Sequence, residues 1–106
     1  MNERLRINNP FGEEVILTEI VWQEILQKHP EVKNLISEIE RTVSEPDFIK
    51  ESIYDSRSTL YYTFHSHVFG GKYIVVVVKS VERNYISTIY ITNKPSSKGK
   101  ILWTKK

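Results

Sequence analysis

The three histidines of this 106-residue chain are the first candidates for chemistry, because imidazole transfers protons near neutral pH and binds metals. His65 and His67 are two residues apart, a spacing that places both side chains on one face of a strand. A zinc site needs at least a third ligand, and the chain contains no cysteine. The sequence therefore predicts no metal site, and contact with a phosphate is the alternative chemistry for His65. A metal-dependent hydrolase that uses His65 and His67 is kept as a third interpretation. His29 precedes Pro30, a position typical of a helix cap or connector.

Length and composition indicate one globular domain over residues 1–106. The chain is 40% hydrophobic and 26% charged, with four glycines and four prolines, which excludes disordered and collagen-like classes. The absence of cysteine excludes disulfide scaffolds and thiolate nucleophiles, so we expect a cytoplasmic protein. The N-terminus shows no apolar export signal, and the longest apolar run, residues 74–78, is far shorter than the ~20 residues that span a bilayer. We therefore expect no association with membranes.

Charge is distributed unevenly along the chain. Residues 1–50 contain six basic and ten acidic side chains, a net charge of −4. Residues 51–106 contain nine basic and three acidic side chains, a net charge of +6. A basic half of this kind suits a polyanionic partner such as RNA.

The N-terminal half predicts a short strand followed by two amphipathic helices. After the apolar run at residues 15–17, Thr18 can cap a helix that begins at Glu19 and ends near Lys28. A second helix is predicted from Pro30 to about Ser44, because its apolar residues recur at helical spacing. These apolar residues are Val32, Leu35, Ile36, Ile39 and Val43.

Beyond residue 46 the apolar pattern changes to the period of a strand. Strands are predicted over residues 59–64, 73–78 and 85–92, with a short strand at 48–54 and an edge strand at 101–103. Helices followed by antiparallel strands are typical of an α+β fold. We therefore expect two N-terminal helices packed on one face of a four- to five-stranded antiparallel sheet, with the other face left to solvent or ligand.

Several short motifs in the chain resemble a known nuclease family. They are Val-Ile-Leu-Thr, Val-Trp-Gln-Glu-Ile-Leu-Gln-Lys-His-Pro-Glu, Glu-Pro-Asp-Phe-Ile, Tyr-Ile-Val-Val-Val-Val-Lys and Ile-Ser-Thr-Ile-Tyr-Ile-Thr. Over about residues 13–103 the chain resembles the phage-associated barnase–EndoU–colicin–RelE-like (BECR-fold) nuclease domains, which include toxin modules. The resemblance implies a toxin-like, metal-independent endoribonuclease that needs no cofactor and cleaves RNA through attack of its own 2′-hydroxyl. It also implies a cognate antitoxin or immunity protein as a partner.

The resemblance further implies which residues act on RNA, a reaction that needs a base, an acid and donors for the charged phosphorane. The family's Trp-x-His-Ile stretch is Trp-Gln-Glu-Ile here, so Glu24 stands at the position of the family's histidine. The His-Pro-Glu stretch matches at His29, and the family's turn cation and strand threonine correspond to Arg57 and Thr88. The exchange at position 24 leaves two alternatives. Either Glu24 acts as the base, or the domain is inactive and binds RNA or a protein.

Each of these four residues also has a purely structural interpretation. His29 can cap a helix, and Glu24 can be a solvated helix residue. Arg57 can pair with Asp55 within its turn, although a guanidinium also suits a phosphate. Thr88 can serve only to pack the sheet.

Four further residues are predicted to bind the substrate. Tyr62 is the best candidate among the tyrosines for stacking on a base, although tyrosine is also ordinary sheet material. His65 is a candidate for contact with a phosphate. Thr92 and Lys94, which follow the matched threonine strand, are candidates for further substrate contacts.

Overall fold

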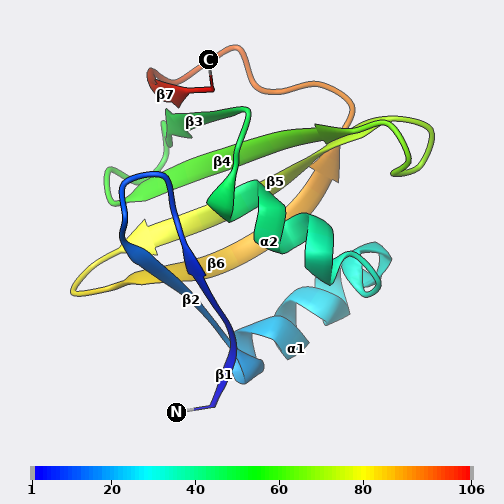
Figure 1. Ribbon diagram of the computed structural model, residues 1–106, viewed down its shortest axis with the longest axis horizontal. Coiled ribbons are helices and arrows are strands. Elements are labelled where there is room, and N and C mark those ends of the chain that lie inside the picture. The colour runs from blue at the N-terminus through cyan, green and yellow to red at the C-terminus, as the bar shows by residue number, and fades with distance from the viewer. Residues whose placement is uncertain (1, 106) are drawn as a thin grey trace.

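The computed structural model describes residues 2–105, which form one mixed sheet of seven strands with two α-helices (Figure 1). The elements are β1 (Glu3–Asn8), β2 (Glu14–Thr18), α1 (Glu19–Lys28), a 3₁₀ turn (Pro30–Val32), α2 (Ile36–Ser44), β3 (Phe48–Glu51), β4 (Ser58–His65), β5 (Lys72–Ser80), β6 (Asn84–Thr92) and β7 (Ile101–Thr104). The order across the sheet is β1-β2-β6-β5-β4-β3-β7. Within the described residues, neither helix has the length and apolar character needed to cross a membrane.

The expected sheet of four to five antiparallel strands is wrong. β2 pairs antiparallel with β1 and parallel with β6, so the sheet is mixed and has seven strands. No strand was predicted at β1 because charged and polar residues fill most of it, and Ile7 is its one buried side chain. Such charge is common on edge strands, where it opposes pairing with other chains. Here Arg6 binds Glu14 at 2.8 Å and also Glu3.

The second predicted helix is also interrupted, whereas the first matches its prediction. α1 begins after Thr18, whose hydroxyl accepts a hydrogen bond from the Val21 N–H at 3.3 Å, and ends before His29. The predicted helix from Pro30 to Ser44 instead divides into the 3₁₀ turn and α2. Asn34 lies at the break, where its low helix propensity permits the tighter turn.

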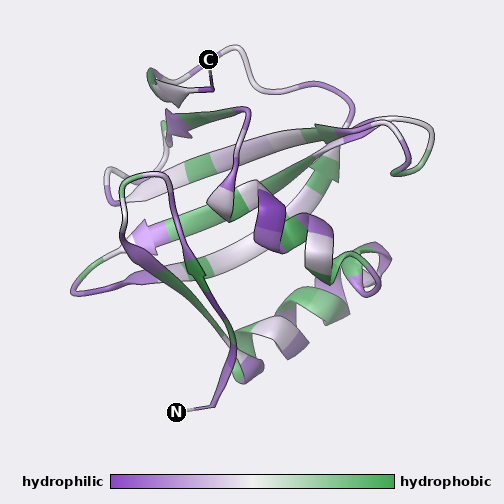
Figure 2. Cartoon of the chain, viewed as in Figure 1, coloured by the Kyte–Doolittle hydropathy of each residue, from purple (hydrophilic) through white to green (hydrophobic). Residues whose placement is uncertain are grey.

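Strand alternation gives the sheet two chemically different faces. Figure 1 shows α2 lying across β4 and β5, with α1 beside β6. The side chains beneath α2 form the hydrophobic core, which includes Tyr61, Ile74, Val76, Val78, Ile86 and Ile89 together with Ile39 and Val43 of α2. The opposite face, here called the open face, carries the alternate residues Lys50, Leu60, Tyr62, Val75, Val77, Lys79, Thr88 and Tyr90. Figure 2 shows how β5 changes from hydrophobic in its middle to hydrophilic at the arrowhead.

A buried chain of hydrogen bonds joins α2 to β4. The Thr42 hydroxyl donates to the Glu38 carbonyl at 2.7 Å and lies 2.6 Å from the Thr63 hydroxyl, which lies 2.7 Å from His65 Nε2. Since Thr42 has only one proton to donate, Thr63 donates to Thr42 and His65 Nε2–H donates to Thr63. His65 is 3% exposed, and this burial lowers its pKa, as do Arg41 and His67. His65 therefore packs against α2 on the side of the sheet opposite Tyr62.

The core assignment predicts a large loss of stability for Ile39→Ala. Ile39 is fully buried between α2 and the sheet, so its truncation should lower the free energy of unfolding by about 2–5 kcal/mol. Ile20 on α1 is 75% exposed, and Ile20→Ala should change stability by less than about 0.5 kcal/mol. Urea unfolding of both variants measures the difference. Similar losses in the two would contradict the packing described here.

Burial of His65 predicts that stability falls as the solution becomes acidic. Above the ordinary histidine pKa of 6.5, His65 is neutral in both states and its contribution to stability is complete. As the pH falls from 6.5 toward the lowered pKa of the folded protein, the unfolded chain takes up a proton first and stability is lost. Thermal unfolding between about pH 5 and 7.5 should show this slope in the wild type. The slope should shrink in His65→Gln and persist in His29→Gln, and an unchanged slope in His65→Gln would refute the assignment.

Candidate functional site

A small pocket, here called the edge pocket, lies between α1 and β6. β2 pairs with β6 only at Asn84 and Tyr85, so among residues 2–105 the rest of that edge has no strand beside it. α1 packs there instead. The resulting pocket has a volume of about 230 Å³ and is lined by Glu24, Ile25, Gln27, Lys28, Ser87 and Thr88. It brings together two of the residues predicted to be catalytic, Glu24 and Thr88.

Regular helix geometry in α1 and a bulge in β6 explain this combination of side chains. Glu24 and Lys28 are four residues apart on α1, so they lie on the same side of the helix. On β6 the register shifts, because Val77 pairs with Thr88 and Val78 pairs with Ile86. Ser87 is the extra residue of this bulge, and its hydroxyl donates to the Val77 carbonyl at 3.3 Å. The pocket therefore presents a carboxylate, an ammonium and two hydroxyls.

His29 lies at the end of α1, next to the open face. Its backbone N–H donates to the Ile25 carbonyl at 2.7 Å, and its ring centroid is 6.4 Å from that of Tyr90. Tyr90 is two residues beyond Thr88, so both side chains lie on the open face. His29 Nδ1 is 3.4 Å from a carboxylate oxygen of Glu31, and Nε2 has no hydrogen-bond partner within residues 2–105. This contact helps to orient the ring and leaves Nε2 able to exchange a proton.

Tyr62 and Tyr90 are two of the aromatic side chains of the open face, which by strand parity also carries Phe48, Phe64 and Tyr73. Both pair with Val75, from opposite sides, and both line a second pocket, of about 480 Å³. Burial raises the pKa of both phenols, so they are neutral hydroxyls at physiological pH. Tyr62 also stacks on Phe48 with ring centroids 4.7 Å apart and is only 2% exposed, so its ring is an inner wall of that pocket.

The other residues named from the sequence lie elsewhere. Arg57 is in the exposed turn before β4, with its Nε 3.8 Å from a carboxylate oxygen of Asp55, and it lines neither pocket. Thr92 and Lys94 form a local turn after β6, in which the Thr92 hydroxyl donates to the Lys94 carbonyl at 3.0 Å. His65 is buried beneath α2. The structure therefore places Glu24 and Thr88 in one pocket, His29 beside Tyr90 of β6, and Tyr62 on β4 in the second pocket, and it leaves these other residues outside.

The sequence prediction missed three side chains of this region. Lys28 and Tyr90 could have been found by periodicity, since one is a helix turn from Glu24 and the other is two strand residues from Thr88. The exposure of Ser87 in the edge pocket depends on the bulge, which no residue pattern in β6 indicates.

Metal ligands are not grouped in this structure. Within residues 2–105, no cluster of three or more His, Asp or Glu side chains is arranged to hold a metal ion. His67 lies in the turn after β4 and not in the strand, so the two histidines do not share a strand face as the sequence predicted, and His67 Nε2 is 2.8 Å from a Glu38 carboxylate oxygen on α2.

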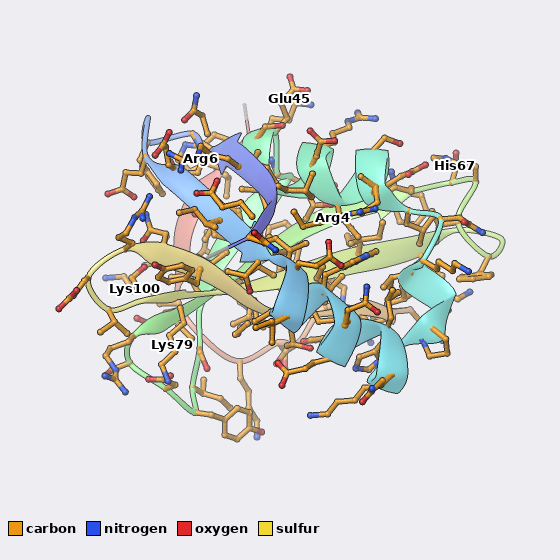
Figure 3. The ribbon with its side chains drawn as sticks, turned by 90° about the horizontal axis from the view of Figure 1, so that it is seen from below. Arg4, Arg6, Glu45, His67, Lys79 and Lys100 are labelled. Atoms are coloured by element: carbon orange, nitrogen blue, oxygen red, sulfur yellow. The ribbon has the colours of Figure 1, made fainter. Side chains whose placement is uncertain are left out.

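Positive charge is prominent on the open side of the sheet. Figure 3 shows Lys79 and Lys100 on the side away from α2, whereas Glu45 lies on the side of α2. Lys50 and Lys98 line the second pocket. Lys79 is 3.4 Å from a carboxylate oxygen of Asp55, which partly balances its charge, so Lys50 and Lys98 are the cations that favour an anionic ligand at this pocket.

Proton-transfer groups and hydroxyls therefore lie next to a basic, aromatic surface. A carboxylate and an imidazole can accept and donate protons, and an ammonium with hydroxyls can bind the oxygens of an anionic substrate. Comparisons of the chain with protein-family models, with curated proteins and with solved structures found no match.

Proposed function

We propose that this protein is a toxin-like, metal-independent endoribonuclease that acts on RNA in the cytoplasm. One observation carries the proposal. Glu24, His29 and Thr88 are separated in the sequence, and the motifs that resemble BECR-fold nucleases name all three. In the structure Glu24 and Thr88 share one pocket, and His29 lies beside the neighbouring Tyr90.

The reaction proposed is internal transfer at one phosphodiester. The Glu24 carboxylate takes the proton from the 2′-hydroxyl, and the 2′-oxygen then attacks the adjacent phosphorus. The bond from phosphorus to the 5′-oxygen breaks, and protonated His29 gives its proton to that oxygen. Lys28 and the Thr88 hydroxyl donate to the non-bridging oxygens as negative charge develops. The products are a 2′,3′-cyclic phosphate and a 5′-hydroxyl.

The open face supplies the complementary binding surface. RNA affinity would come from its lysines, and an antitoxin or immunity protein would inhibit the enzyme by covering the same surface with acidic side chains. One feature favours a second candidate, an inactive module that binds RNA or a protein without cleavage. This feature is the carboxylate at position 24, where the nucleases that the chain resembles have a histidine.

The mechanism predicts that cleavage needs no divalent metal. Purified protein should cleave RNA in excess EDTA and leave 2′,3′-cyclic phosphate ends, because the attacking group is the substrate's own hydroxyl. Gel electrophoresis with end-specific enzymatic treatment of the fragments identifies these termini. Cleavage that appears only when Mg²⁺ or Mn²⁺ is added would contradict the mechanism.

The assigned proton-transfer groups predict the effects of two substitutions. His29→Ala and Glu24→Gln should each lower the cleavage rate by about 10²-fold or more, the contribution typical of a general acid or base. His67→Ala and Glu40→Gln are matched controls on exposed residues away from the edge pocket, and they should retain wild-type rates. If all four folded variants cleave equally well, the site is misplaced. If the wild type binds RNA without cleaving it, the binding-module candidate is favoured.

A further inference from the structure

The second pocket, of about 480 Å³, lies on the open face between the sheet and the loop of residues 93–100. It is lined by Lys50, Glu51, Ser52, Ile53, Tyr54, Leu60, Tyr62, Val77, Tyr90, Ser96 and Lys98. None of the groups assigned above to proton transfer is among them. The reaction mechanism therefore leaves this pocket, hereafter the loop pocket, without a role.

Lys50 gives the loop pocket an uncompensated positive charge. The residue is only 7% exposed, and lysine is rarely buried so deeply unless it is paired with an acid. Its ammonium donates to the Ser96 carbonyl at 2.6 Å, which uses one of its three protons, and within residues 2–105 no carboxylate oxygen lies within 4.0 Å of it. Glu51 is the one acid that lines the pocket, and strand alternation directs its side chain away from that of Lys50. A buried cation in this state favours an anionic ligand.

The remaining walls of the loop pocket suit a flat ring. Leu60 and Val77 form an apolar floor, and the rings of Tyr62 and Tyr90 stand beside it. Tyr54 lies in the turn after β3 and is 91% exposed, which is unusual for an aromatic side chain at the rim of a pocket. Aromatic side chains of this kind stack on nucleobases. A volume of about 480 Å³ lies in the range of small-ligand sites and suits one nucleotide.

Tyr90 connects the loop pocket to the proposed cleavage site. It lines the pocket, and its ring centroid is 6.4 Å from that of His29. We infer that the loop pocket is a nucleotide subsite, which holds one base against the tyrosines and the phosphate of that nucleotide on Lys50. This inference rests on the proposed function in one respect, because it takes that nucleotide to be the one next to the cleaved bond.

Binding of mononucleotides tests the inference without requiring cleavage. We would titrate the full-length protein with the four ribonucleoside 3′-monophosphates, with the matching nucleosides and with inorganic phosphate, and follow backbone amide resonances by NMR. At least one monophosphate should bind and shift resonances of β3, of residues 93–100 and of Tyr62 and Tyr90. The nucleoside and inorganic phosphate should each bind about tenfold more weakly, since each lacks half of the contacts.

Two lysine variants isolate the charge. Lys50→Met keeps an unbranched apolar side chain and removes the ammonium, so it should reduce affinity for the monophosphate about tenfold, to that of the nucleoside. Lys72→Met is the matched control, because Lys72 also donates to a backbone carbonyl, that of Phe69 at 3.1 Å, outside the pocket. It should bind as the wild type does. Tyr54→Ala alters only an exposed side chain, so it provides a folded variant in any case, and it should weaken both the monophosphate and the nucleoside.

Several outcomes would overturn the inference. They are shifts confined to residues outside the loop pocket, inorganic phosphate binding as tightly as the monophosphates, and wild-type affinity in folded Lys50→Met or in Tyr54→Ala. If a monophosphate binds in the pocket but RNA is never cleaved, the proposed function fails and the subsite remains. If RNA is cleaved but no mononucleotide binds, the subsite fails and the nuclease remains.

Discussion

The short parallel pairing of β2 with β6 is the constraint on which the rest of the structure depends. Two parallel neighbouring strands cannot be joined by a tight turn, so the chain between them must leave the sheet and return. Here that connection contains both helices and the strands β3, β4 and β5. Because the pairing involves only Val15 with Asn84 and Ile16 with Tyr85, most of β6 remains open along that edge. α1 starts directly from the last residue of β2 and occupies this edge, which creates the edge pocket.

At the other side of the sheet, a close approach between two backbone segments holds the loop of residues 93–100 in place. The Glu51 N–H donates to the Lys100 carbonyl at 2.9 Å, and Lys50 donates to the carbonyl of Ser96. Gly99 has φ +88°, and a Cβ there would lie 2.5 Å from the Glu51 carbonyl oxygen. Only glycine both adopts this positive φ without strain and leaves room for the Glu51 carbonyl. Gly99 therefore determines how closely the loop can cover the open face. The loop pocket exists because the loop is fixed to β3 at these points.

The sequence predicted those parts of the fold whose signals are local. The strands around residues 59–64, 73–78 and 85–92 are rich in β-branched and aromatic residues, and the first helix has its capping threonine. The parallel pairing and the strand β1 have no such signal, because partner choice is a long-range property and half of the residues of β1 are charged. The alternation of side chains along a strand also excludes a shared contact for two of the predicted substrate-binding residues. Tyr62 and His65 are three residues apart in β4, so they must face opposite sides of the sheet and cannot contact the same ligand.

For the candidate site, too, the sequence predicted only what local motifs indicate. Glu24, His29 and Thr88 came from short motifs, whereas the buried charge of Lys50 depends on how a loop folds over a short strand. The structure also gives a physical reason why a carboxylate at position 24 is compatible with an anionic substrate. Lys28, one helix turn away, offsets the charge of Glu24, so the edge pocket itself has little net attraction for a phosphate. In the proposed mechanism, binding and chemistry are divided between two surfaces, with the lysines of the open face attracting the RNA backbone and the edge pocket moving the proton.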